Sequence, residues 1–169
     1  MKNLRSNKKG FTLIELLAVI VILAILVMVA IPAVTKYLNE SRKGTFADNA
    51  LAAIGAVRNE AVIEGLPSGT TYYLDDINDL LEKKLLSSPF GQDYDGGSYI
   101  TINIADDGTT TYSMCLTDAG GNGLTVVTGE GENKEKRNVL KEEEISKDTV
   151  LIGTAESCGE EPASGGSGE

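Results

Sequence analysis

The apolar and polar positions divide this chain into two regions of different character. Sixteen consecutive residues from Leu16 to Ile31 are apolar, and Phe11, Leu13 and Ile14 extend the apolar segment toward the N-terminus. A helix of about 20 apolar residues spans the hydrocarbon core of a bilayer. The segment therefore predicts a helix that can cross a membrane, whereas the rest of the chain has the composition of a polar, glycine-rich globular domain.

After Pro32 the pattern becomes amphipathic and predicts that the helix continues to Glu64, giving one helix from Phe11 to Glu64 that ends before Gly65. Pro32 has no N–H to donate and its ring clashes with the preceding turn, so a kink or local melting is expected over residues 28–32; alternatively, Pro32 only ends the membrane span. The apolar positions that recur at helical spacing are Phe46, Ala50, Leu51, Ile54, Val57, Ala61 and Val62.

The remaining pattern predicts a short helix and a sheet, and therefore an α+β fold. The short helix is expected from Asp76 to Leu86, with Asp75 as its N-terminal cap and a turn-rich loop after it. Alternating apolar positions then predict an antiparallel sheet that packs on the second half of the long helix. The expected strands are residues 99–105, 110–117, 124–128 and 149–154.

Two segments near the C-terminus lack a clear periodicity. Residues 132–148 are densely charged with mixed signs, which predicts a solvated loop with one or two helical turns; the alternative is an assembly contact made through charge pairs. Residues 159–169 are of low complexity, which predicts a flexible tail.

Charge is as unevenly distributed as hydropathy. Of 15 basic residues, four precede Phe11, where there are no acidic ones; the part that follows has 11 basic and 25 acidic residues, a formal charge of −14. A basic flank beside an apolar span keeps the N-terminus in the cytoplasm and sends the C-terminal part across the membrane. An acidic exported domain does not suit nucleic acid, so no direct nucleic-acid binding is expected.

The two cysteines, Cys115 and Cys158, both lie in the part expected to be exported. In an oxidising compartment they predict one disulfide, and the alternative is two free thiols. Within the strand of residues 110–117, alternation places Tyr112, Met114 and Leu116 on the inward face and Cys115 on the edge or outer face. The last strand would bring Cys158 to it.

Glu15 is the anomaly of the apolar segment. A carboxylate at the centre of a membrane helix costs about 2.5 to 3.5 kcal/mol on insertion scales. A secretory signal peptide needs a shorter apolar core and a small-x-small cleavage site, and a lipoprotein signal needs a cysteine, which the first hundred residues lack. A plain membrane anchor explains the length of the segment but neither Glu15 nor Gly10 at the change from basic to apolar residues.

The stretch KKG followed by FTLIELLAVIVILAILVMVAIP resembles the N-terminus of a type IV prepilin, over roughly the first 35 residues. The resemblance implies that a prepilin peptidase cuts between Gly10 and Phe11 and methylates the new N-terminus at Phe11. It gives Glu15 and Pro32 roles in assembly. The new amine lies about 6 Å from Glu15 along the helix, or belongs to a neighbouring subunit, and in either case can neutralise the carboxylate.

The resemblance also implies a pilin fold and an organisation of the chain: a cleaved leader (1–10), a membrane-spanning or fibre-core half-helix (11–34), and a globular head (35–169) that includes the rest of the helix. The implied function is that of a structural subunit of a type IV pilus, a helical homo-oligomeric surface fibre used in adhesion and twitching motility. The implied partners are the peptidase and methyltransferase, the assembly platform and the cytoplasmic membrane. The alternatives are a pseudopilin of a type II secretion or competence (DNA uptake) system, and a minor membrane-anchored tip adhesin.

No combination of residues in the sequence supports catalysis. There is no histidine, no glycine-rich phosphate loop that opens a helix, and no helical pair of carboxylates placed for a metal. Asp93 and Asp95 form part of a calcium-loop pattern, but an EF-hand would need a glutamate at position 104, where Ile104 stands. We therefore expect no enzyme activity, no cofactor and no metal.

Overall fold

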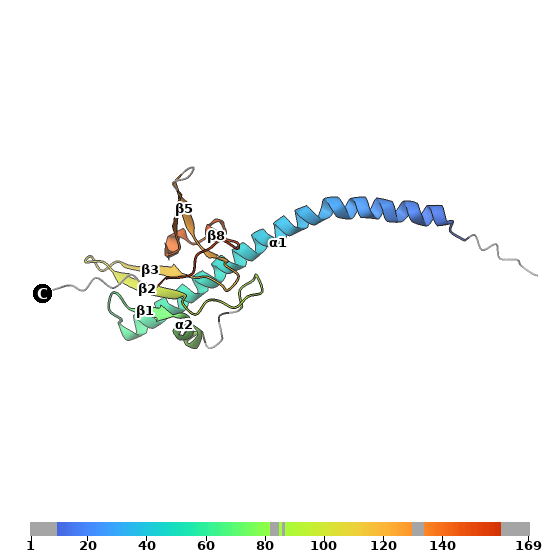
Figure 1. Ribbon diagram of the computed structural model, residues 1–169. Helices are drawn as coiled ribbons and strands as arrows, with labels where there is room; N and C mark the ends of the chain where they lie inside the picture. Colours follow the sequence, from blue (N-terminus) through green and yellow to red (C-terminus); the bar gives the residue numbers. More distant parts are fainter. Residues whose placement is uncertain (1–9, 82–84, 86, 130–133, 160–169) are drawn as a thin grey trace, which may run out of the picture. The chain divides into compact units, whose positions relative to one another are not determined.

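A computed structural model describes residues 10–81, 85, 87–129 and 134–159 (Figure 1). The chain divides into two compact units, Met1–Asn39 and Glu40–Glu169. The long helix α1, Leu13–Glu64, contributes to both, and an antiparallel sheet follows it in the chain. This confirms the predicted α+β class with a pilin-like layout. Helix α1 begins at Leu13 rather than Phe11 and is helical without interruption over residues 28–32, so the local melting expected there is absent.

The second half of α1 forms one side of the core of the second unit. Its buried face includes three alanines and three larger apolar side chains. Leu51 and Val62 were expected on this face but are 37% and 78% exposed, because the buried stripe is narrower than predicted. Gly65, at φ +64°, ends the helix in the left-handed conformation that favours glycine. The buried residues are Phe46, Ala47, Ala50, Ala53, Ile54 and Val57.

The main sheet has four antiparallel strands in the order β1-β2-β3-β7. The two longest, β2 and β3, lie within predicted strands, and the turn between them contains Gly108 at φ +82°. Ile100, Ile102 and Met114 are fully buried, whereas Ile104, which alternates with Ile100 and Ile102, lies at the end of β2 and is 37% exposed. The strands are β1 (Thr71–Tyr73), β2 (Tyr99–Ile104), β3 (Thr110–Cys115) and β7 (Leu140–Lys141).

The short helix α2 spans Leu74–Leu80, earlier and shorter than the predicted 76–86. Strand β1 precedes it directly, so the helix starts at the end of a strand that the pattern did not predict. Asp75 is not its cap; instead, the Asp76 carboxylate accepts the backbone N–H of Tyr73 at 3.0 Å. Leu85 is buried outside the helix, and residues 82–84 and 86 lie outside the described part of the chain.

Beyond β3 the chain forms two further two-stranded sheets. The prediction of a single strand at residues 124–128 in the main sheet is wrong, because two short strands of other sheets occupy this stretch. They are separated at Thr125, whose N–H donates to the carbonyl of Thr149 at 2.7 Å. Gly123, which lies one residue before the predicted strand, is part of β4. The strands pair as β4 (Gly123–Leu124) with β8 (Val150–Leu151) and as β5 (Val126–Thr128) with β6 (Glu135–Arg137).

The charged segment is more ordered than the solvated loop that was predicted. The one or two helical turns that were predicted are present as two 3₁₀ turns, η1 (Glu142–Glu144) and η2 (Lys147–Thr149), but the described residues also contain the strands β6 and β7. Leu140 is fully buried and Ile145 is 7% exposed, so two apolar side chains anchor the segment to the core. Most of the predicted flexible tail, residues 160–169, lies outside the described residues.

Candidate processing and assembly site

The bond between Gly10 and Phe11 lies outside the helices and strands. Gly10 is exposed and Phe11 is 83% exposed. A Cβ added at Gly10 would meet no described atom within 4 Å, and the residue does not have a positive φ. Neither the local backbone nor the packing therefore requires glycine at this position. A requirement for glycine here would have to come from a protein that recognises this bond.

Thr12 and Glu15 form a reciprocal cap at the start of α1. Both the backbone N–H and the hydroxyl of Thr12 donate to Oε2 of Glu15 at 2.8 Å, and the N–H of Glu15 donates to the Thr12 hydroxyl at 3.3 Å. This is a capping box, in which Thr-x-x-Glu satisfies two of the free N–H groups at a helix N-terminus. The Thr-x-x-Glu spacing of Thr12 and Glu15 is the sequence signal for this cap, which the apolar pattern alone does not show.

The cap changes the interpretation of Glu15. Before cleavage the nitrogen of Phe11 is a neutral amide that offers Glu15 no positive charge, but the Oε2 atom of Glu15 already accepts two hydrogen bonds from the neutral Thr12. Among the described residues, Oε1 accepts none. One oxygen of Glu15 thus holds the helix start while the other stays available for a cation.

The apolar part of α1 is uncovered on all sides. From Phe11 to Val34 its large apolar side chains are 51% to 85% exposed, and none of the most apolar window of α1 is buried. Among the described residues, α1 is the helix whose length and composition suffice to cross a membrane. Fully burying one such side chain is worth about 1.5 to 3 kcal/mol, so a helix of this kind requires an apolar environment outside its own chain.

Pro32 lies inside α1, where it can donate no backbone hydrogen bond. Three residues later, the hydroxyl of Thr35 donates to the carbonyl of Ile31 at 3.0 Å. Such back-bonding by threonine supplies a polar contact to a helix carbonyl close to the proline. The helix therefore passes through Pro32 rather than ending there.

Cys115 and Cys158 are bonded to each other, with their Cα atoms 5.8 Å apart. Cys115 was expected at an edge or on an outer face of the sheet, yet it is fully buried. The reason is that the C-terminal segment covers this part of the sheet: a Cβ at Gly97 would lie 3.5 Å from the carbonyl oxygen of Cys158. The disulfide thus fixes the C-terminal segment to the end of β3 and beside Gly97.

Ion pairs attach the charged segment to the second half of α1. Arg58 of α1 forms a hydrogen bond and a salt bridge with Glu142 and lies 5.0 Å from the ring centroid of Tyr112. The hydrogen bond to Glu142 raises the pKa of Arg58. Near the start of the second unit, the ammonium of Lys147 lies 3.2 Å from Glu40, and this contact raises the pKa of Lys147.

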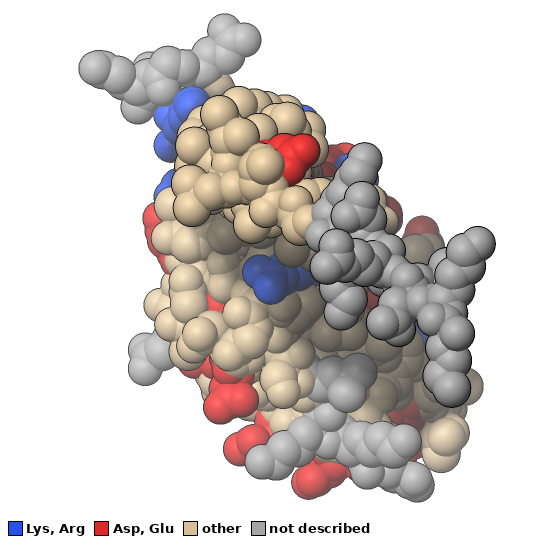
Figure 2. Space-filling model, turned by 90° about the vertical axis from the view of Figure 1, so that its right-hand side faces the viewer, with Lys and Arg blue, Asp and Glu red and all other residues tan. Residues whose placement is uncertain are grey.

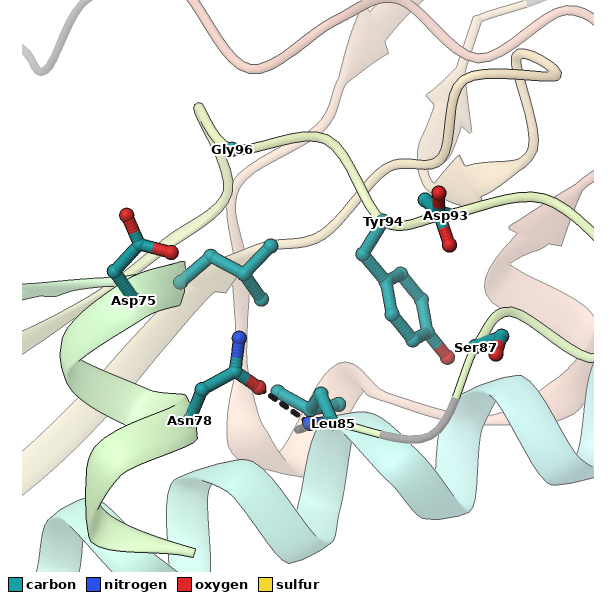
Figure 3. Close-up of a pocket in the computed structure, with 8 residues that line it drawn as sticks. Asp75, Asn78, Leu85, Ser87, Asp93, Tyr94 and Gly96 are labelled. Carbon is teal, nitrogen blue, oxygen red and sulfur yellow. Dashed lines mark hydrogen bonds between the residues drawn. The ribbon is translucent and has the colours of Figure 1, made fainter. Parts of the chain in front are cut away.

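A hollow of about 490 Å³ lies between α2 and the loop after it (Figure 3). Asp75 and Asp93 stand on opposite sides of it, so their carboxylates do not converge on one point. The nearby Asp95 carboxylate accepts the N–H of Gly97 at 3.1 Å. Among the described residues there is no group of three or more His, Cys, Asp or Glu side chains that could hold a metal ion.

Tyr94 separates this hollow from the core. It is 9% exposed, and its hydroxyl accepts a hydrogen bond from the side chain of Asn49 at 2.9 Å. Burial raises the pKa of Tyr94 to about 12. Its ring also meets Phe46 edge to face, with 5.4 Å between ring centroids, so Tyr94 is a core residue with one satisfied polar atom.

The profile described as the prokaryotic N-terminal methylation motif matches residues 5–31, the type IV prepilin-like signal, and confirms the resemblance found in the sequence. This motif supports a type IV pilin-like or pseudopilin protein and implies prepilin peptidase processing and pilus-type assembly. It belongs to pilin-type structural proteins rather than to known enzymes. No curated protein and no solved structure matches the chain.

Proposed function

We propose that this chain is the structural subunit of a type IV pilus, made as a prepilin and assembled through α1 into a helical surface fibre. The observation that supports this most strongly is the exposed apolar helix that carries the matched methylation motif. Before assembly the bilayer covers these side chains, and in the fibre the helices of neighbouring copies do so. An apolar helix and a methylation motif fit membrane anchoring before assembly.

Residues 1–10 are the leader in this proposal, residues 11–34 are the membrane and fibre-core half of the helix, and residues 35–169 are the head. The peptidase cuts after Gly10, and the methylated amine of Phe11 pairs with the Oε1 atom of Glu15, of its own or a neighbouring chain. The Thr12–Glu15 cap holds the carboxylate at the helix start, ready for that amine. A buried carboxylate with a cationic partner is favourable only in a docked register, so Glu15 would guide assembly.

The exported head determines what the fibre presents at the cell surface. Figure 2 shows acidic side chains gathered along the lower edge of the face it displays, consistent with the formal charge of −14 after Gly10. Adhesion and twitching motility are the fibre-level activities that we propose. A short secretion or competence filament built from the same signal is the outcome that the experiment must distinguish.

Two measurements test the proposal. Mass spectrometry of the chain extracted from its native membrane should find methylated Phe11 at the N-terminus; a chain that starts at Met1 would refute prepilin processing. Electron microscopy with an antibody to the head should then find labelled surface fibres. Processed chain without long fibres, under conditions in which the chain is abundant, would favour the pseudopilin.

A further inference from the structure

A buried polar junction joins three segments of the head. Asp118, 4% exposed, lies at its centre and accepts the hydroxyl of Ser88 at 2.5 Å and the N–H of Gly120 at 2.9 Å. Asn122, 5% exposed, donates its side-chain amide to both oxygens of Asp118, at 3.0 and 2.9 Å. No described cation forms a salt bridge with Asp118, so its partners are neutral hydrogen-bond donors.

Asn122 uses both ends of its side chain. While its amide nitrogen binds Asp118, its carbonyl oxygen accepts the N–H of Gly153 at 3.0 Å. Next to this contact, the N–H of Ala155 donates to the carbonyl of Gly121 at 2.9 Å. Asn122 therefore holds the segment that runs from β8 to the disulfide at Cys158.

The residue after Asn122 must be glycine for a steric reason. A Cβ at Gly123 would lie 2.7 Å from a methyl carbon of Thr117 and 2.9 Å from the carbonyl oxygen of Leu116. Both distances are shorter than real Cβ contacts allow. Hydrogen bonding thus requires asparagine at position 122, and packing requires glycine at position 123. Together they form an Asn-Gly pair, and the sequence contains no other.

An Asn-Gly pair has a reactivity of its own. In a mobile chain, the backbone nitrogen of the glycine attacks Cγ of the asparagine, the Cγ–N bond breaks and ammonia leaves, forming a five-membered succinimide. Water then opens this ring to aspartate or isoaspartate. A glycine favours the attack because it has no side chain to block it and the freest backbone.

We propose that Asn122 is a deamidation site that the folded head protects from reaction. We propose further that conversion of Asn122 to aspartate or isoaspartate loosens the segment between β8 and the disulfide. The bonds to Asp118 and Gly153 hold the Asn122 side chain at both ends, which opposes the rotation that the attack requires. Conversion to an acid removes the donor to Asp118 and places a second carboxylate beside it. Two buried carboxylates in contact without a cation are destabilising, so the segment opens more often after the conversion.

The first test compares deamidation rates in the full chain, solubilised in detergent. Peptide mapping by mass spectrometry follows Asn122 in folded, oxidised protein and in reduced protein unfolded in urea, with Asn103 as an internal reference. Conversion of Asn122 should be at least about tenfold slower in the folded protein, because attack needs local opening. Equal rates would overturn the protection, and no conversion in the unfolded chain would overturn the site.

The second test weakens the junction without touching the reacting pair. Ser88→Ala removes one donor to Asp118, and Asp118→Asn removes the charge that the Asn122 amide binds. Both folded variants should deamidate at Asn122 faster than the parent, Asp118→Asn more so, with their folding checked by thermal melting. If Asp118→Asn does not fold, Ser88→Ala decides the question. An unchanged rate in a folded variant would show that the junction does not protect Asn122.

The third test examines the product. Asn122→Asp mimics the converted residue, and Asn103→Asp adds the same charge at an exposed position of β2. Asn122→Asp should lower the melting temperature clearly more than Asn103→Asp, and reductant should cleave its disulfide faster. Equal melting temperatures and reduction rates for the two variants would show that conversion does not loosen the segment.

Discussion

At the residue scale, Glu15 has two oxygens with different roles. Oε2 completes the capping box with Thr12, and Oε1 accepts no described hydrogen bond. A membrane offers no water to satisfy the first N–H groups of a helix, so a cap at this position is worth more than at an exposed helix start. Glu15 therefore stabilises the helix in each single chain, and the proposed pairing with an amine adds to that role.

Separating the two roles of Glu15 requires variants of both capping residues. Glu15→Ala should be processed normally but assemble poorly, because it removes the cap and the charge together. Thr12→Ala keeps the charge and weakens the cap at a cost of about 1 kcal/mol, so its fibre yield should fall less. Fibre yield by shearing and immunoblotting measures both. Normal fibres from Glu15→Ala would refute the docking role, and equal losses from the two variants would leave capping as the whole role.

Gly10 offers a test of recognition without a folding effect. Gly10→Val should block cleavage and leave the melting temperature of the head unchanged, because a Cβ there meets no described atom within 4 Å. The mass of the membrane-extracted chain reports cleavage, and circular dichroism reports melting. Gly44→Ala, in helix α1 and also without a neighbour within 4 Å, is the matched control and should be cut normally. Normal cleavage of Gly10→Val would contradict the proposed site.

At the element scale, the charged segment and the loop with Tyr94 are tied to α1 by side chains. Arg58 of α1 contacts Glu142 of η1 and the ring of Tyr112 in β3, so a single residue connects helix, turn and sheet. Asn49 of α1 reaches Tyr94 in the same way. Arg58 thus helps to position the segment after β3, and Asn49 helps to position the loop before β2.

Removing the Arg58 side chain should destabilise the head. Arg58→Ala loses a partly exposed ion pair and a cation–π contact, together worth about 1 kcal/mol after allowance for solvent screening. Arg42→Ala is the control, because Arg42 lies on the same helix, is exposed and has no described salt bridge. Urea unfolding of both variants measures the difference. A loss in Arg58→Ala no larger than in Arg42→Ala would mean that these contacts contribute nothing.

The raised pKa of Tyr94 makes the stability of the head depend on pH in the alkaline range. Its pKa is raised from about 10 to about 12 in the folded protein, so the folded state keeps a proton that the unfolded state loses. The contribution of Tyr94 to the free energy of unfolding is therefore constant below about pH 10 and falls as the pH rises from about 10 toward about 12. Tyr94→Phe should flatten this part of the stability curve, measured by urea unfolding at each pH, and Tyr37→Phe, at an exposed tyrosine, should not. Identical curves for all three proteins would refute the assignment.

At the scale of the whole molecule, the two units are stabilised in different ways. The first has an apolar helix without buried residues, whereas the second has a core between α1 and the sheet and a disulfide that closes a loop of 43 residues. The second unit therefore has a core of its own, whereas the apolar side chains of the helix in the first unit have no cover among the described residues.

The disulfide should contribute stability to the head and not to processing. Replacing both cysteines, Cys115→Ser with Cys158→Ser, should lower the free energy of unfolding by up to about 4 kcal/mol, because the unfolded chain regains loop entropy. Chemical unfolding of the variant and of the parent, each with and without reductant, measures this. The reduced parent should match the variant, and cleavage after Gly10 should be unaffected. A variant as stable as the oxidised parent would show that the disulfide does not contribute to the stability of the head.

The sequence by itself determined the features that rest on local pattern. The apolar run and the glycine at position 65 set the long helix, and alternation identified β2 and β3. The prepilin-like signal at residues 5–31, which includes Gly10, Phe11 and Glu15, was also readable from residue order alone. Thr12 could have been found from the Thr-x-x-Glu spacing. These features depend on residues within a few positions of one another, so a linear pattern contains the information.

Tertiary structure alone decided the short strands and the buried polar contacts. Strand β7 has only two residues and forms because Leu140 pairs with Met114 of β3. Residues 123–128 form two strands instead of one because β4 pairs with β8 and β5 pairs with β6. Cys115 is buried because a segment some forty residues later covers it. In each case the partner lies far along the chain, and hydrogen bonds between distant backbones override what the local sequence prefers.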